Sequence, residues 1–71
     1  MEIEDEDIIT VTFNSTALAS ATYDRAAQEL TVVFRNGRSA DYSGVPVLVF
    51  LGLARASSAG LYYDTKIKGR Y

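Results

Sequence analysis

The chain has 71 residues, 48 % of them hydrophobic and 23 % charged, and it contains neither cysteine nor histidine. This length allows one small domain near the lower limit for a self-sufficient core, and the composition is typical of a globular protein. The lack of cysteine excludes a disulfide-stapled secreted scaffold and makes the cytoplasm the expected compartment. The lack of histidine removes the commonest general base and leaves only carboxylates for a zinc site.

No segment has the pattern of a secretory signal or of a membrane span. The chain does not open with basic residues followed by an apolar run, as a signal peptide would. Its longest apolar stretch, residues 45–54, is about half of the roughly 20 residues that a membrane helix needs. We therefore expect a soluble protein without a membrane partner.

The net charge of −2 is unevenly distributed along the chain. Residues 1–7 contain five of the nine acids and no base, whereas residues 8–71 have four acids against seven bases, a net charge of +3. We interpret residues 1–7 as an acidic tail and residues 8–71 as a single, mildly cationic domain. The tail is either simply solvated or competes with an anionic ligand for the cationic domain.

Alternation with a period of two predicts the first strands. In residues 8–14, three apolar side chains alternate with polar ones, which predicts an optional edge strand. Residues 17–24 also alternate, and strict alternation places Leu18 and Tyr23 on opposite faces. A loop should follow at residues 25–28.

The clearest strand is predicted at residues 29–35, where three apolar side chains share one face. Before it, Asp24 is expected to cap or turn the loop. After it, Asn36 and Gly37 predict a type I′ turn, in which both central residues have positive φ. Residues 38–42 should then pair back antiparallel.

The pattern changes to a helix at Pro46, which suits a first helical position because its missing amide hydrogen would have no partner there. A helix is predicted over residues 46–57, with Gly60 as a stop and a short helical or irregular C-terminal segment. Ser57 and Ser58 should bond to backbone groups or cap the next turn; alternatively, amides near Gly60 could hold a phosphate. The expected core face of the helix holds Val49, Phe50, Leu53 and Ala56.

The second face of this helix is unusually apolar for a surface helix. Val47, Leu48 and Leu51 lie across from the core face. They require cover, either from the terminal segments of the chain or from a second copy or another protein.

The chain has no phosphate-binding glycine motif, and its carboxylates show no paired spacing. We therefore expect a non-catalytic protein without cofactor or metal.

Several short motifs follow one another in a fixed order along residues 14–71. They are Ser-Thr-x-Leu at 15–18, Thr-Tyr-Asp at 22–24, LTVVFRNG at 30–37, Tyr42, Gly-Val-Pro at 44–46, F-x-x-L-x-x-A-S-S-x-G-x-Y-Y-D at 50–64 and Ile67. Together, these motifs resemble those of the KTSC domain family. The family is named after the C-terminal extension of some lysyl-tRNA synthetases and also occurs as stand-alone small proteins. The resemblance implies an RNA-binding module.

The sequence departs from the family pattern at three places. The family's central Tyr-x-Tyr pair falls on Ala40 and Tyr42, so a stacking platform of two rings would be incomplete. Leu61 stands where the family is often basic, and the second helix face is aliphatic where the family tends to be polar. These departures favour a protein contact over nucleic acid.

The C-terminal segment is the strongest candidate for an RNA contact. Lys66, Lys68 and Arg70 would form one stripe in an extended segment, whereas in a helix only Lys66 and Arg70 share a face. The alternative is that these cations are merely solvated and that Tyr62 or Tyr63 fills the core. The complete set of RNA-binding candidates is Arg35, Arg38, Tyr42, Tyr62, Lys66, Lys68 and Arg70.

These observations predict an α+β domain in which a three-stranded antiparallel meander, with an optional fourth strand, packs on one main helix. The strands are expected at 17–24, 29–35 and 38–43. The leading functional hypothesis is a non-catalytic module for tRNA-like or single-stranded RNA. The alternatives are a protein-interaction or homo-oligomerisation module that uses Val47, Leu48 and Leu51, and a small anionic ligand such as a nucleotide between subunits.

Overall fold

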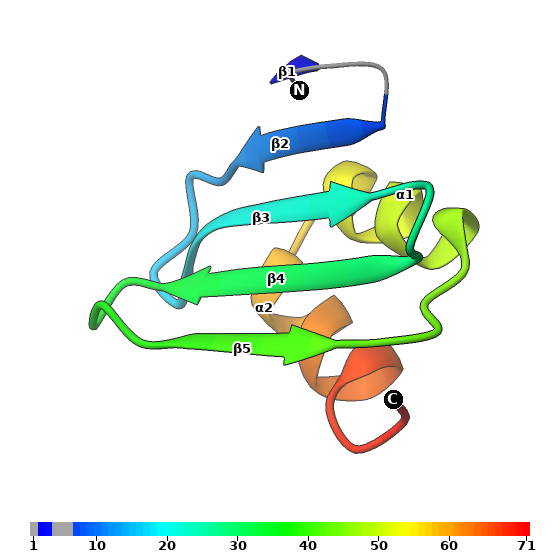
Figure 1. Ribbon diagram of the computed structural model, residues 1–71. Helices are drawn as coiled ribbons and strands as arrows, with labels where there is room; N and C mark the ends of the chain where they lie inside the picture. Colours follow the sequence, from blue (N-terminus) through cyan, green and yellow to red (C-terminus); the bar gives the residue numbers. More distant parts are fainter. Residues whose placement is uncertain (1, 4–6) are drawn as a thin grey trace.

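The computed structural model describes residues 2–3 and 7–71 and shows an α+β fold (Figure 1). The elements in chain order are β1 (Glu2–Ile3), β2 (Ile8–Thr12), β3 (Leu18–Asp24), β4 (Glu29–Phe34), β5 (Ser39–Tyr42), α1 (Val47–Arg55), α2 (Ala59–Tyr62) and the π-helix η1 (Tyr63–Ile67). The strands form one antiparallel sheet in the order β1-β2-β3-β4-β5. The three predicted strands and the main helix are confirmed.

The optional N-terminal strand exists, but it is not an edge strand. Ile9 of β2 pairs with Ile3 of β1 on one side and with Tyr23 of β3 on the other. The edge prediction was therefore wrong, because part of the expected acidic tail adds a two-residue strand. Residues 1 and 4–6 of that tail lie outside the described residues.

Strand β3 contains a β-bulge that strict alternation does not predict. The register with β4 shifts between Leu18 and Ser20, which face Phe34 and Val33. The extra residue in β3 changes the side-chain parity, so Leu18 is fully buried on the same side as Tyr23. The expectation that these two side chains lie on opposite faces was therefore wrong.

The two turns beside β4 are stabilised in different ways, one by a side-chain carboxylate and the other by a backbone hydrogen bond. Before β4, Asp24 Oδ1 accepts hydrogen bonds from the amides of Ala26 and Ala27 at 3.0 and 3.2 Å, which confirms its predicted turn role. After β4, Gly37 N donates to Phe34 O at 3.0 Å, and Gly37 has φ +89°.

The predicted type I′ turn at Asn36-Gly37 was wrong. Asn36 has no positive φ, and the loop spans three residues, since Phe34 N donates to Arg38 O at 2.8 Å. This is the arrangement of a type I turn followed by a left-handed glycine. Asn36 Oδ1 accepts from Arg38 N at 2.9 Å and so stabilises this form.

Helix α1 starts one residue later and ends two residues earlier than the predicted helix at residues 46–57. Pro46 is the N-cap, with ψ 148°, so α1 begins at Val47. Extended geometry at Ala56 (ψ 139°) ends α1 at Arg55. Ser58 Oγ accepts from Leu61 N and caps α2, as predicted, whereas Gly60 lies inside α2 and does not stop a helix.

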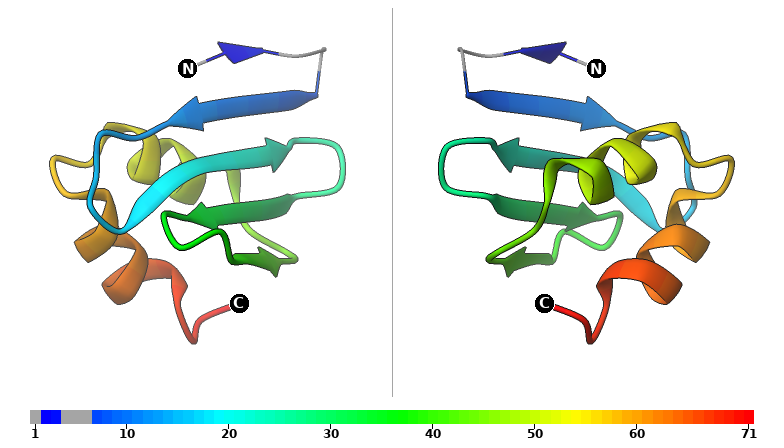
Figure 2. Two further views of the ribbon diagram at one scale, coloured as in Figure 1. Left: turned by 90° about the vertical axis from the view of Figure 1, so that its left-hand side faces the viewer. Right: turned by 90° about the vertical axis from the view of Figure 1, so that its right-hand side faces the viewer.

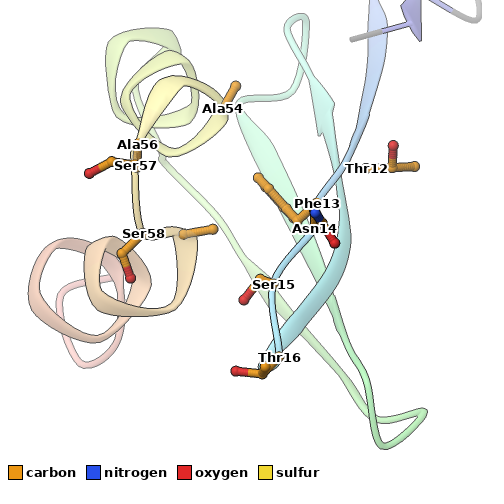
Figure 3. A pocket seen from close by; sticks show the side chains of 10 residues that line it. Thr12, Phe13, Asn14, Ser15, Thr16, Ala54, Ala56, Ser57 and Ser58 are labelled. Carbon is orange, nitrogen blue, oxygen red and sulfur yellow. The ribbon is translucent and has the colours of Figure 1, made fainter.

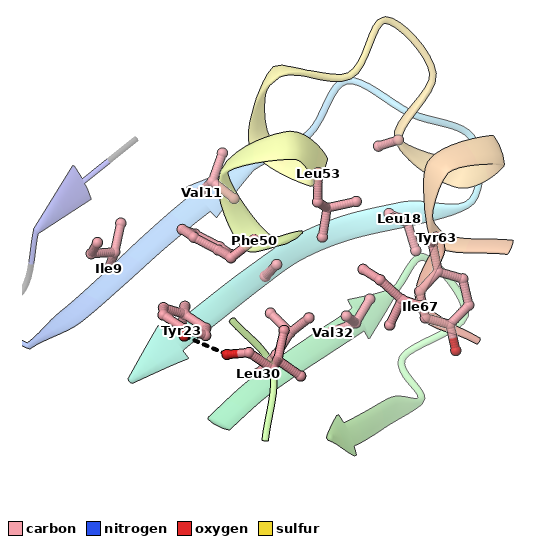
Figure 4. Packing of buried hydrophobic residues seen from close by; sticks show 13 residues of the cluster. Ile9, Val11, Leu18, Tyr23, Leu30, Val32, Phe50, Leu53, Tyr63 and Ile67 are labelled. Carbon is pink, nitrogen blue, oxygen red and sulfur yellow. Dashed lines mark hydrogen bonds between the residues drawn. The ribbon is translucent and has the colours of Figure 1, made fainter. Parts of the chain in front are cut away.

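The helices of the described part of the chain cover one face of the sheet, and none of them lies on the other face, which we call the open face (Figure 2). The core fills the space between the two layers (Figure 4). Phe50 and Leu53 of α1 are buried as predicted, while Val49 is half-buried and Ala56 falls beyond the helix end. Their partners include Val11, Leu18, Ala21, Tyr23, Leu30, Val32, Val45 and Ile67.

Candidate nucleic-acid-binding surface

Three cations gather at the C-terminal end of η1, and we call Lys66, Lys68 and Arg70 the C-terminal cationic cluster. Lys66 lies in the last turn of η1, and Lys68 follows it as the C-cap. Gly69 has φ +78° and reverses the chain. The backbone amide of Arg70 then donates to Ile67 O at 3.0 Å, and Arg70 Nε donates to Thr65 O at 3.0 Å.

This geometry differs from both conformations considered from the sequence. The segment is not extended, and η1 ends at Ile67, so Lys66 and Arg70 do not share a helical face. The chain reversal nevertheless keeps all three cations within one turn of the helix end. Negative charge of the terminal carbonyls favours cations there.

The C-terminal cationic cluster is open to solvent. Lys66, Lys68 and Arg70 are exposed. Among the side chains of residues 7–71, no carboxylate forms an ion pair with any of them. Their charge is therefore available to an anionic partner.

The other two predicted cations lie at the β4–β5 turn. Arg35 uses its guanidinium to hold the β2–β3 loop, with Nε donating to Ser15 O at 2.9 Å and Nη2 to Phe13 O at 2.6 Å. Arg38 is exposed. Figure 1 shows this turn and the C-terminus near opposite ends of β5, so the predicted cations form two groups and not one patch.

The predicted tyrosines are occupied by internal contacts. The Tyr42 hydroxyl shares a hydrogen bond with the Tyr63 hydroxyl, and their rings meet edge to face at 6.1 Å. Tyr62 Oη donates to Val49 O at 3.1 Å, and its ring lies over Gly52. Both Tyr42 and Tyr62 are half-buried, and the hydrogen bonds of their hydroxyl groups fasten η1 and α2 to the rest of the domain.

Tyr63 is the tyrosine that fills the core, a choice that the sequence left open. Its ring packs edge to face against Phe34 at 5.3 Å and is almost fully buried. Burial, followed by the hydrogen bond with Tyr42, raises the pKa of Tyr63 to about 12.

The open face of the sheet carries the opposite charge. Asp24, Glu29 and Asp41 line a shallow hollow there together with two threonines. Thr31 Oγ1 donates to Asp41 Oδ1 at 2.6 Å across β4 and β5. Three of the four acids of residues 8–71 therefore lie on this face, which disfavours an anionic ligand.

A polar groove of about 460 Å³ lies between the β2–β3 loop and the α1–α2 junction (Figure 3). The described residues that line it carry hydroxyl and amide groups, one aromatic ring and small apolar groups, and none of them has a formal charge. We call it the hydroxyl groove; its polar lining consists of Thr12, Asn14, Ser15, Thr16, Ser57 and Ser58. No sequence motif predicted it, because its two walls are about 40 residues apart in the chain.

The residues of the predicted protein interface differ in exposure. Leu48 is 75 % exposed and Val47 is 38 % exposed, whereas Leu51 is half-buried and packs against the core. Leu61 on α2 is also 64 % exposed. Leu48 therefore projects most fully from the second face of α1.

Comparisons with known proteins place this geometry in a family. The sequence pattern of the KTSC domain matches residues 14–71. The fold is similar to the crystal structure of a KTSC domain protein from Yersinia pestis, with 28 % sequence identity, 89 % of each chain covered and a TM-score of 0.83. No curated protein matches the chain.

Two further findings concern the kind of protein. The KTSC domain is not a known enzyme family. Within the described part of the chain, none of the helices is long and apolar enough to cross a membrane. The match over residues 14–71 and the shared fold together show that this chain belongs to the KTSC domain family.

Proposed function

We propose that the domain is a non-catalytic RNA-binding module. The C-terminal cationic cluster contacts the phosphates of a single-stranded or tRNA-like RNA, and Arg38 provides a second contact at the other end of β5. The observation that carries this proposal is the exposed position of Lys66, Lys68 and Arg70 without carboxylate partners in the described part of the chain. Clustered cations bind phosphates by releasing counterions, without reading the base sequence.

The charge distribution supports one orientation of the RNA. The open sheet face, with Asp24, Glu29 and Asp41, repels phosphates, so the strand lies on the side of η1 and β5. The family resemblance to the extension of a tRNA enzyme favours RNA over other polyanions. Tyr42 and Tyr62 support the surface from within, since both hydroxyls are used by the fold.

The salt dependence of binding tests this proposal. We predict that short single-stranded RNA binds more weakly as salt rises from about 50 to about 200 mM. Replacing Lys66 and Lys68 by alanine should lower the affinity and reduce the salt slope by about 0.7 for each phosphate that the variant no longer neutralises. Neither lysine side chain makes a hydrogen bond to another described residue, so this double variant should keep the fold. Fluorescence anisotropy measures both quantities.

The matched control removes two positive charges elsewhere. Arg25 and Arg55 are exposed and lie in the β3–β4 turn and the last turn of α1. The R25A/R55A variant has the same net charge as K66A/K68A and should keep the wild-type salt slope. Equal slopes for the two variants, or no RNA binding by the wild type, would refute the proposed surface.

A second candidate function is self-association through α1. Leu48 is 75 % exposed and Val47 beside it is 38 % exposed, and contiguous exposed apolar patches mark interfaces when they are large enough. Light scattering at high protein concentration should then detect a dimer that Leu48→Gln abolishes and Leu61→Gln retains. A monomeric wild type would exclude this candidate.

A further inference from the structure

The hydroxyl groove is bounded by two segments that the fold holds in place. One wall is the β2–β3 loop, which Arg35 anchors through the carbonyl oxygens of Phe13 and Ser15. The other wall is the junction of α1 and α2, which Ser58 fixes as a helix cap. The groove volume of about 460 Å³ lies in the range of about 300–1,000 Å³ that small-molecule sites occupy.

The serine hydroxyls of the two walls are oriented as hydrogen-bond donors. Ser15 Oγ accepts from the amides of Ala17 and Leu18 at 3.1 and 3.3 Å, and Ser58 Oγ accepts from Leu61 N at 3.3 Å. Each serine oxygen thus accepts from backbone amides, and its hydroxyl proton remains available for another acceptor. A ligand between them can therefore accept a hydrogen bond from each hydroxyl.

An aromatic ring and small side chains line the rest of the groove. Phe13 is half-buried and packs against the outside of the core. In Figure 3, Phe13, Ser15 and Thr16 point from the loop towards the segment that carries Ser58. Ala59 and two other alanines complete the lining. The ring and the small side chains together suit a flat ligand.

The absence of formal charge in this lining argues against a phosphate and for an uncharged group. A nucleic-acid base is flat, stacks on aromatic rings and carries acceptor atoms on its edges.

We infer that the hydroxyl groove accepts one unpaired base of the bound RNA, which stacks on Phe13 and accepts hydrogen bonds from Ser15 and Ser58. This inference rests on the proposed RNA-binding function and adds a stacking site that Tyr42 and Tyr62 do not provide. The base contact contributes affinity without a salt dependence, whereas the C-terminal cationic cluster supplies the salt-dependent part.

Filling the groove tests the inference. Thr16 is exposed and its side chain bonds to no other described residue, so Thr16→Trp blocks the groove without disturbing a bond of the fold. We expect the affinity for a short single-stranded oligouridylate to fall about tenfold, within the range that one stacked base contributes. The salt slope should stay unchanged, because the same phosphates are still neutralised.

The control for this variant is Ala26→Trp, which places the same side chain on the exposed β3–β4 turn and should bind as the wild type does. A second pair of variants, both at Phe13, tests the same contact in case Thr16→Trp does not fold. Phe13→Leu removes the ring and should weaken binding, whereas Phe13→Tyr keeps the ring and should bind more tightly than Phe13→Leu does.

Three outcomes distinguish the two proposals. Unchanged affinity of Thr16→Trp, while the wild type binds RNA, would overturn the groove inference and leave the proposed function intact. A loss of affinity accompanied by a flatter salt slope would also overturn it, since a phosphate contact would be responsible. If the wild type binds no RNA at all, the proposed function and the inference both fail.

Discussion

Tyr23 and Tyr63 each join the helical layer to the sheet through both a ring and a hydroxyl. Tyr23 stacks on Phe50 with ring centroids 5.0 Å apart, and its hydroxyl donates to Val45 O at 2.5 Å. Burial raises the pKa of Tyr23, with a further contribution from Asp24. An apolar core of this size thus depends on polar groups that are satisfied inside it.

The pKa of Tyr63 leads to a prediction about alkaline stability. Its folded-state pKa is about 12, above its ordinary value of 10.0, so the native state holds the proton more tightly than the unfolded state. The contribution of Tyr63 to the free energy of unfolding should therefore be constant below pH ~10 and fall between pH ~10 and ~12 by at most about 1.4 kcal/mol per pH unit. Urea denaturation at a series of pH values measures this decrease.

The variant Tyr63→Phe is the control, because it removes the ionisable group and keeps the ring. It should be less stable than the wild type at neutral pH by about 1 kcal/mol, since Tyr42 loses its hydrogen-bond partner. Its stability should decline less between pH ~10 and ~12. An identical decline in both proteins would contradict the assignment to Tyr63.

At the scale of elements, α1 and α2 pack through a glycine that the sequence did not single out. A Cβ atom at Gly52 would lie 2.7 Å from Tyr62 Cζ and even closer to Tyr62 Oη. The absence of a side chain lets the Tyr62 ring cover α1 and reach Val49 O. Gly52 therefore serves helix packing and not backbone conformation.

We predict that Gly52→Ala destabilises the domain by about 1 kcal/mol or more. Alanine in a helix interior normally stabilises by about 0.5–1 kcal/mol relative to glycine. Here the clash with Tyr62 outweighs that gain, because overpacking costs about 1–3 kcal/mol. Urea denaturation gives the free energy of unfolding.

The Tyr62→Leu background provides the control for this effect. Without the Tyr62 ring, Gly52→Ala should have its ordinary stabilising effect relative to Tyr62→Leu alone. An increase in stability in the wild-type background would show that Tyr62 does not restrict Gly52.

The elements that could be predicted from the sequence are those fixed by local pattern. The strand at β4 follows from period-two alternation and the main helix from the change after Pro46. The bulge in β3 could not be predicted, because only pairing with β4 shows that Leu18 shares the core with Tyr23. The turn after β4 was located correctly but given the wrong type, since asparagine and glycine are compatible with both turn forms.

The sequence alone identified the exposed cations of the candidate site, but it did not predict how they are arranged in space. The exposed cations of the C-terminal segment were identified from sequence alone, but their grouping depends on the chain reversal at Gly69. The roles of Tyr42 and Tyr63 depend on a tertiary hydrogen bond. The hydroxyl groove brings Ser15 and Ser58 to facing walls, a proximity that no local pattern encodes.

At the scale of the whole molecule, the acidic side chains of the open face and the C-terminal cationic cluster lie on different sides of the two-layer fold. The helices cover one face of the sheet (Figure 2), and the uncovered face carries Asp24, Glu29 and Asp41. The C-terminal cationic cluster lies at the end of η1, on the covered side. A molecule with this polarity should bind a polyanion on one side and repel it from the other.

Mapping the bound RNA on the protein tests the proposed polarity most directly. Amide chemical shifts of the isotope-labelled protein can be followed by NMR during titration with a short single-stranded RNA at low salt. We predict that the shifts concentrate at residues 64–71, at the β4–β5 turn and at the walls of the hydroxyl groove, while Thr22 and Thr31 on the open sheet face do not respond. Shifts centred on the open sheet face, or no shifts at all, would contradict it.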